Sequence, residues 1–207
     1  MSQFFQIHPD NPQHRLIRQA VEVLRDGGVI VYPTDSAYAL GCHIGDKKAL
    51  DRIREIRQLD NKHNFTLMCR DLSEISTYAK LTSNTLYRTL NAHTPGAYTF
   101  ILKATSEVPR RLMHPKRRTI GIRVPSNPIA HMLLEEHSEP IMSTTLIMPN
   151  DDMPLTDPYD IRDILEHQVD LVIDGGYCGL EPTTVVNMTE DVPEVVRKGE
   201  GNPAPFE

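Results

Sequence analysis

The spacing of apolar residues along the chain switches repeatedly between a helical and an extended pattern. After Asn11-Pro12, apolar side chains recur at positions 16, 17, 20, 21 and 24, and the pattern ends at Gly27-Gly28. This spacing predicts an amphipathic helix that Asn11 caps and Pro12 opens. The β-branched run 29–32 follows at once and predicts a buried strand that stops before Pro33.

Shorter patterns of both kinds continue to the end of the chain. Asp46 is suited to cap a second helix, whose apolar stripe is narrow among charged residues. Further helices are expected over residues 72–80, 83–92, 128–136 and 159–167, and an exposed loop is expected over 148–158. Further strands are expected over residues 65–69, 98–102, 119–124, 140–145, 169–173, 184–186 and 195–197.

The order of these elements predicts the fold class. Seven or more strands are mixed with helices, but the two do not alternate cleanly, so a twisted mixed sheet is favoured over a purely parallel one. A chain of 207 residues suffices for one large core, and it contains no repeat and no clear linker. We therefore expect a single α/β domain over residues 1–207.

Composition narrows the classes of partner and the compartment. The net charge of −6 argues against a protein that coats nucleic acid through its overall charge, but it leaves a local basic patch open. The three widely spaced cysteines predict free thiols in a reducing compartment, and the nine scattered histidines predict no structural metal site. Because the start of the chain lacks a signal-peptide pattern and no apolar run approaches about 20 residues, we expect a cytoplasmic protein without a membrane partner.

Polar side chains cluster where predicted strands end. Four follow the strand 29–32, and three end the strand 140–145: Thr34, Asp35, Ser36, Tyr38, Ser143, Thr144 and Thr145. Strand ends are where α/β proteins hold small ligands, although an ordinary turn and the strand preference of threonine explain the same residues. The sequence lacks the glycine-rich phosphate loops and the Gly-x-Ser-x-Gly elbow, so any nucleotide site must be built another way.

A basic run stands out in this acidic chain. Six cations lie within fourteen residues: Arg110, Arg111, Lys116, Arg117, Arg118 and Arg123. We interpret the run either as a site for the phosphates of a nucleotide or an RNA backbone, or as a solvated loop. Arg123 differs from the rest because it falls on the opposite face of its strand from Ile120 and Ile122. There it needs a carboxylate partner, either from the protein or from a ligand.

Six short motifs in a fixed order resemble the YrdC-like family along nearly the whole chain. They are Pro33-Thr34-Asp35 with Tyr38, Pro95-Gly96 before Thr99, Thr119 to Arg123 with Pro125, Ser143-Thr144-Thr145, Glu181 with Thr183-Thr184-Val185-Val186, and Arg197. The chain is most similar to the YciO branch of the family. The resemblance implies a twisted, mostly open mixed sheet flanked by helices around a deep basic cleft. Members of the family include enzymes that make threonylcarbamoyl-adenylate from threonine, bicarbonate and ATP for tRNA modification.

The resemblance also implies roles for individual residues. Those that would hold the amino acid are Thr34, Arg123, Ser143 and either Thr183 or Thr184, with Arg123 facing its carboxylate. Those that would face the nucleotide are Arg57, Thr119, Thr145 and Arg197. ATP would be a substrate, with Mg²⁺ carried on its phosphates and no dedicated protein ligand for that ion.

Two motifs of the synthase branch are altered in this chain. The Lys-x-Arg motif aligns with Arg57-Gln58-Leu59, and the Ser-x-Asn motif aligns with Thr145-Leu146-Ile147. Leucine cannot clamp a phosphate and isoleucine cannot replace the hydrogen bonds of an amide, so we expect a weak or altered synthase. Lys62 and His63 are candidates to substitute in part.

Two alternatives stay open at this point. One is a protein that binds double-stranded RNA or tRNA through the basic cleft without this chemistry, using Arg110, Arg111, Lys116, Arg117 and Arg118. The other is an enzyme of the same fold that acts on a different carbamoyl or adenylate compound. Salt separates the first alternative from a small-ligand pocket, because binding to an RNA backbone weakens steeply as salt rises.

Overall fold

A computed structural model of the protein describes residues 1–60 and 62–207. The strands within these residues are β1 Gln3–Gln6, β2 Ile30–Tyr32, β3 Ala39–His43, β4 Thr66–Met68, β5 Tyr98–Lys103, β6 Thr119–Arg123, β7 Ile141–Thr145, β8 Leu171–Asp174, β9 Thr184–Asn187 and β10 Glu194–Arg197. They form one sheet in the order β1-β8-β2-β3-β7-β4-β6-β5-β9-β10. Parallel pairs join β1 to β8, β8 to β2, β4 to β6 and β5 to β9, and the other pairs are antiparallel. The prediction of a mixed, mostly open sheet is confirmed.

The helices follow the predicted spacing closely. They are α1 His14–Arg25, α2 Lys47–Arg57, α3 Leu72–Tyr78, α4 Asn84–His93, α5 Pro128–His137 and α6 Pro158–Leu165, with short 3₁₀ turns at Arg110–Leu112 and Ala204–Phe206. The Asp46 carboxylate caps α2, accepting a hydrogen bond from the amide of Ala49 at 2.8 Å as its position predicts. Within the described part of the chain, no helix is both long and apolar enough to cross a bilayer.

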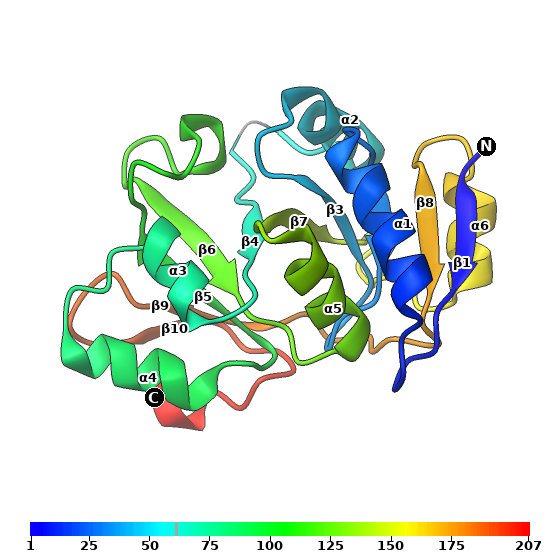
Figure 1. Ribbon diagram of the computed structural model, residues 1–207. Helices are drawn as coiled ribbons and strands as arrows, with labels where there is room; N and C mark the ends of the chain where they lie inside the picture. The colour runs from blue at the N-terminus through cyan, green and yellow to red at the C-terminus, as the bar shows by residue number, and fades with distance from the viewer. Residues whose placement is uncertain (61) are drawn as a thin grey trace.

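Helices cover the two faces of the sheet unequally. On one face, α1 and α5 lie side by side over the half of the sheet that contains β8, β2 and β3, as Figure 1 shows. Apolar residues of α2, α3, α4 and α6 join the core on the opposite face. Strand residues alternate between these two layers, as the pleat requires.

The face that α1 and α5 cover continues over β4, β6, β5 and β9, where polar and small side chains mix with apolar ones such as Ile101 and Val185. On β6, Ile120 and Ile122 enter the core of the opposite face, whereas Thr119, Gly121 and Arg123 point to this one. The same alternation turns Thr99 of β5 to this face. This uncovered half of the sheet positions the functional site.

Two strands and one helix start differ from the prediction. The segments β1 and β3 were not expected, because neither sequence contains a β-branched residue. Pairing on both sides makes β3 a strand, with β2 and β7 as neighbours. The helix α1 begins at His14 rather than near Asn11, and its N-cap is Gln13, whose side chain accepts a hydrogen bond from the amide of His8 instead of capping the helix.

Candidate functional site

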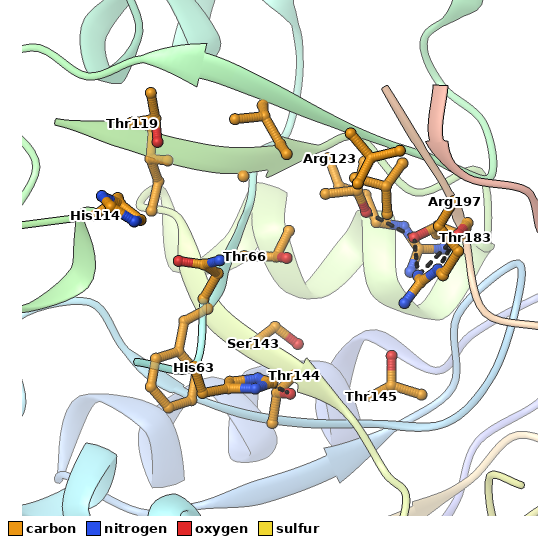
Figure 2. Close-up of a pocket in the computed structure, with 18 of the residues that line it drawn as sticks. His63, Thr66, His114, Thr119, Arg123, Ser143, Thr144, Thr145, Thr183 and Arg197 are labelled. Atoms are coloured by element: carbon orange, nitrogen blue, oxygen red, sulfur yellow. Dashed lines mark hydrogen bonds between the residues drawn. The ribbon is translucent and has the colours of Figure 1, made fainter. Parts of the chain in front are cut away.

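A cleft of about 1020 Å³ opens over the uncovered half of the sheet. Its floor comes from β4, β5, β6 and β9, and its walls include the end of β7, the end of α2 and residues of β10. This volume lies at the upper end of the range for small-molecule sites, so the cleft has room for a nucleotide together with a second small molecule. Figure 2 shows the lining side chains converging on the space between these elements.

The cleft is basic although the chain is acidic. Its charged lining residues are Arg57, Lys103, Arg117, Arg123 and Arg197 against Glu190 and Glu194. Arg57 of α2, Arg123 of β6 and Arg197 of β10 line the same space although they come from three different elements. An excess of cations in a concave site favours anionic ligands, because the walls concentrate the field.

Gly121 keeps the middle of the cleft floor low. A Cβ atom at this position would lie 3.2 Å from Cγ2 of Thr99 and 3.4 Å from Oγ1 of Thr66. Any larger side chain would stand up into the cleft between these two threonines. The absence of a side chain at Gly121 therefore makes the cleft deeper between Thr66 of β4 and Thr99 of β5.

Arg123 meets the carboxylate partner that its position on β6 predicts. Its guanidinium forms an ion pair with Asp35, and the two side chains are only 7% and 11% exposed. The same carboxylate also accepts hydrogen bonds from the amide of Ser126 at 3.1 Å and from its hydroxyl at 3.0 Å. The Nε atom of Arg123 is buried and has no hydrogen-bond partner among the described residues. The partner is thus a protein carboxylate, and the buried Nε–H of the guanidinium stays unsatisfied.

Arg197 and Thr183 form a second cluster at the same end of the cleft (Figure 2). The Arg197 guanidinium donates to the main-chain oxygen of Thr183 at 2.8 Å from Nη2 and at 3.2 Å from Nε. The hydroxyls of Thr183 and Thr99 lie 2.7 Å apart in a hydrogen bond. Burial lowers the pKa of Arg197. Even so, an arginine stays charged at neutral pH, so this cluster offers a fixed positive charge to a ligand.

The structure separates the two neighbouring threonines of this segment. Thr183 lines the cleft, whereas Thr184 is fully buried. The Thr184 hydroxyl donates to the main-chain oxygen of Gly201 and accepts from the amide of Gly199 at 2.9 Å. Thr184 therefore tethers the C-terminal segment, and the hydroxyl that faces the cleft belongs to Thr183.

Arg57 joins the two altered motifs at the opposite side of the cleft. Its Nε donates to the main-chain oxygen of Ile147 at 2.8 Å, and its Nη1 donates to the Thr144 hydroxyl at 2.8 Å. The Nε2 atom of His63 lies 3.1 Å from the same hydroxyl, and burial together with the nearby Arg57 charge lowers the pKa of His63 to about 4. His63 is therefore neutral at pH 7, and two of the five N–H groups of Arg57 are already in use.

The remaining predicted small-ligand residues are not placed alike. Ser143, Thr119 and Thr145 line the cleft, and the Ser143 hydroxyl lies 2.8 Å from the Tyr32 hydroxyl. Thr34 is not among the lining residues. Its hydroxyl donates to the main-chain oxygen of Ala37 at 2.5 Å and accepts from the amide of Ser36 at 3.1 Å. Thr34 thus shapes the turn that carries Asp35.

The basic run lies at the rim of the cleft. Its five cations before β6 are all exposed: Arg110, Arg111, Lys116, Arg117 and Arg118. Among them Arg117 lines the cleft, and Arg111 donates to the main-chain oxygen of Gly45 at 2.6 Å. The run therefore faces solvent beside the cleft, with one member reaching into it.

His114, which lies inside the basic run, is a lining residue to which the sequence patterns gave no role. Its Nδ1 accepts hydrogen bonds from the amides of Lys116 at 3.3 Å and Arg117 at 3.1 Å. A neutral ring held in this way carries its proton on Nε2. Figure 2 shows the ring beside Thr119, so His114 adds an oriented donor to this end of the cleft. The hydrogen bonding of this turn resembles that of an Asx turn, and the only feature of the sequence that pointed to His114 was its place inside the basic run.

Comparisons with known proteins agree with this geometry. The Sua5, YciO and YrdC family model, described as "Telomere recombination", matches residues 22–199. The uncharacterized protein YciO of Escherichia coli K12 is 63% identical over 206 residues, which is 100% of both chains. The crystal structure of E. coli YciO superposes with a TM-score of 0.95 at 62% identity and covers 100% of both chains.

Two less similar proteins have a name or a bound ligand that bears on activity. A protein of Vibrio vulnificus YJ016 called threonylcarbamoyl-AMP synthase is 30% identical over 132 residues, 62% of this chain and 70% of its own. P. abyssi Sua5, solved in complex with L-threonine, has a TM-score of 0.86 at 23% identity, covering 95% of this chain and 57% of its own. The family match over residues 22–199 and the full-length identity to YciO together show that this chain belongs to the Sua5/YciO/YrdC family.

Proposed function

We propose that the cleft binds an adenine nucleotide and an amino acid, and that the protein is a divergent L-threonylcarbamoyladenylate synthase with weak or altered activity. The observation that carries the proposal is the convergence of Arg57, Arg123 and Arg197 on one cleft large enough for both ligands. The Vibrio relative named threonylcarbamoyl-AMP synthase and the P. abyssi Sua5 complex with L-threonine support the choice of ligands. The product would serve the formation of threonylcarbamoyladenosine in tRNA.

The reaction would proceed in two steps. First, the amine of threonine attacks the carbon of bicarbonate, forms an N–C bond and releases water, which gives a carbamate. A carbamate oxygen then attacks the α-phosphorus of ATP, the bond to the bridging oxygen of the β-phosphate breaks, and pyrophosphate leaves. Such chemistry depends mainly on positioning and on neutralising the charge that builds up around the phosphates.

The amino-acid end of the cleft would contain Arg123, Ser143 and Thr183. Arg123, Ser143 and Thr183 line the same space, and the Arg123 guanidinium would bring its charge toward the carboxylate of the amino acid. Thr34 would act indirectly, because its hydroxyl orders the turn that holds Asp35 against Arg123.

The nucleotide would extend across the cleft, from Arg57 on one side to Arg197 on the other, with Thr119 and Thr145 also facing it. Arg197 is hydrogen-bonded to Thr183, so the two subsites would meet at that pair. That meeting point is suited to an acyl-phosphate bond, in which the amino-acid carbamate and the α-phosphate become joined.

Magnesium would enter as part of the substrate. The acidic lining residues of the cleft are Glu190 and Glu194, and five cations share the same lining. This set does not form a carboxylate cage, so the residues present suit an ion carried on the phosphates of ATP rather than a resident metal.

The altered motifs explain why the rate would be low. Leu59 packs against the apolar core, and Arg57 is partly engaged by the main chain at Ile147. Each missing donor at a developing charge lowers a rate by about 10²–10³-fold.

A pyrophosphate-release assay tests the proposal. ATP, bicarbonate and threonine are incubated with a high concentration of protein, beside Arg197→Gln and a matched control, Arg88→Gln, on the exposed face of α4. Release that requires threonine, persists in Arg88→Gln and disappears in Arg197→Gln supports the synthase. Release no greater than in a protein-free mixture rejects it.

A second candidate function is binding of double-stranded RNA or tRNA without this chemistry. The observation that favours it is the exposed basic run at the rim of the cleft. About five phosphate contacts would lose roughly 10²–10³-fold in affinity between 50 and 200 mM salt. Fluorescence anisotropy with a labelled RNA duplex measures this loss. The double variant Lys116→Gln/Arg118→Gln should flatten the salt dependence, whereas Arg88→Gln should not.

A further inference from the structure

Three side chains with metal-binding atoms meet near the ends of β3 and β7 that lie away from the cleft. They are His43, the last residue of β3, His137, the last residue of α5, and Glu139, which precedes β7. One ligand atom from each lies within 4.8 Å of the others, and His43 Nε2 is 2.8 Å from Glu139 Oε2. The strands β3 and β7 run antiparallel, with Ala39 and Thr145 paired at the cleft end and His43 and Ile141 paired here.

His137 supplies an independent reason to look for a ligand here. The residue is only 2% exposed, and neither of its ring nitrogens has a hydrogen-bond partner among the described residues. Its ring stands edge-on to the ring of His43, with the centroids 5.4 Å apart. A buried imidazole without a partner is unfavourable, because water has been removed and nothing replaces it. A cation held between the two rings and the carboxylate would supply the missing partner.

We propose that His43, His137 and Glu139 bind one divalent transition-metal ion, best matched by Zn²⁺. Two imidazoles and one carboxylate are a common ligand set for zinc, and three protein ligands leave a fourth position for water or another small ligand. Bonds of about 2.0–2.1 Å in a tetrahedron place ligand atoms about 3.4 Å apart. The three atoms already lie within 4.8 Å, so shifts of about 1 Å complete the site.

Binding requires one rearrangement at His43. The amide of Gly45 donates to His43 Nδ1 at 3.1 Å, so the ring carries its proton on Nε2, toward Glu139. When Nε2 binds a metal, the ring proton moves to Nδ1. The Gly45 amide then loses its acceptor on the ring and donates a hydrogen bond to water instead. Gly45 is exposed, so its amide remains hydrogen-bonded.

The ion would fasten three elements together. It would join the end of β3, the end of α5 and the segment before β7, and both strands contribute lining residues to the cleft at their other ends. The solvent-facing side of the site is open, because the His43 and Glu139 side chains are 28% and 49% exposed. The expected effect is therefore a rise in thermal stability on binding, independent of any reaction in the cleft.

Calorimetric titration of Zn²⁺ into the untagged, chelator-treated full chain tests the proposal. The variants are His137→Gln and Glu139→Gln. The control is His131→Gln, which removes a partly exposed histidine of the same helix, 3.7 Å from Glu135. We expect one ion per chain, a melting temperature that rises until one equivalent is added, and at least tenfold weaker binding in both site variants. The control should bind as the natural chain does.

If His137→Gln fails to fold, Glu139→Gln still tests the proposal, because the Glu139 side chain is half-exposed and its replacement should leave the fold intact. Co²⁺ offers a second readout, because visible absorption bands of tetrahedral intensity should appear in the natural chain and be lost in Glu139→Gln. The proposal is overturned if the natural chain binds no Zn²⁺, if Glu139→Gln binds it equally well, or if His131→Gln weakens binding as much as Glu139→Gln.

Discussion

The Nε atom of Arg57 donates a hydrogen bond to the main-chain oxygen of Ile147 at 2.8 Å. This bond connects the two segments in which the chain departs from the synthase motifs. Ile147 lines the cleft, whereas Leu59 packs against the core. The two departures are therefore unequal, because a new polar side chain at position 147 would reach the cleft and one at position 59 would first have to leave the core.

Replacing Ile147 with asparagine should strengthen the proposed synthase reaction. The amide would add a donor beside Arg57 where negative charge develops, so threonine-dependent pyrophosphate release should rise by about tenfold or more. Leu59→Arg alone should change the rate less. The assay is repeated without threonine, since an increase in both conditions would indicate plain ATP hydrolysis and contradict the prediction.

Removing the charge of Asp35 should destabilise the protein strongly. The Asp35→Asn variant leaves the buried guanidinium of Arg123 without a counter-charge, which costs about 3 kcal/mol in the free energy of unfolding. Urea denaturation measures the loss. The control is Lys198→Gln, which breaks an exposed pair with Glu207 and should cost less than about 1 kcal/mol. Equal losses in the two variants would show that the buried pair of Asp35 and Arg123 stabilises the protein no more than an exposed pair does.

The fold was predictable where one strand face is apolar and the other is not. The alternation of Ile120 and Ile122 on β6 placed Arg123 on the open face, and its need for a carboxylate followed from burial. The identity of the partner did not follow, because Asp35 lies 88 residues away and no local pattern links them. Such a contact depends on the order of strands in the sheet.

Other features lacked a local signal altogether. The strand β3 contains Gly41, where a Cβ atom would meet the Tyr32 ring at 2.7 Å, and it is a strand because neighbours pair with it on both sides. Thr183 and Thr184 are equally suited to a strand, so the sequence could not tell which one faces the cleft. The ligand-binding roles stay predictions for all of the proposed site residues, which are Thr34, Arg57, Thr119, Arg123, Ser143, Thr145, Thr183 and Arg197.

The stability of the protein should fall in mildly acidic solution partly through His63. Burial lowers its pKa to about 4 in the folded chain, against an ordinary value of about 6.5. Between these values the unfolded chain binds more protons than the folded chain, so the free energy of unfolding decreases as the pH falls from about 6.5 to about 4. In His63→Gln this decrease should be shallower. Urea denaturation at several pH values measures it, and identical slopes in the two proteins would contradict the assignment.

Valine substitutions at Thr183 and Thr184 should separate ligand binding from stability. Thr183→Val removes a hydroxyl that faces the cleft and bonds to Thr99, so threonine binding should weaken while the free energy of unfolding falls by only about 1 kcal/mol. Thr184→Val leaves the Gly199 amide and the Gly201 oxygen without their partner, so it should lower the free energy of unfolding by about 2 kcal/mol. Titration with threonine and urea denaturation are run on both variants, each serving as the matched control for the other. Weaker threonine binding in Thr184→Val alone would reverse the assignment and make Thr184 the residue that acts on the ligand.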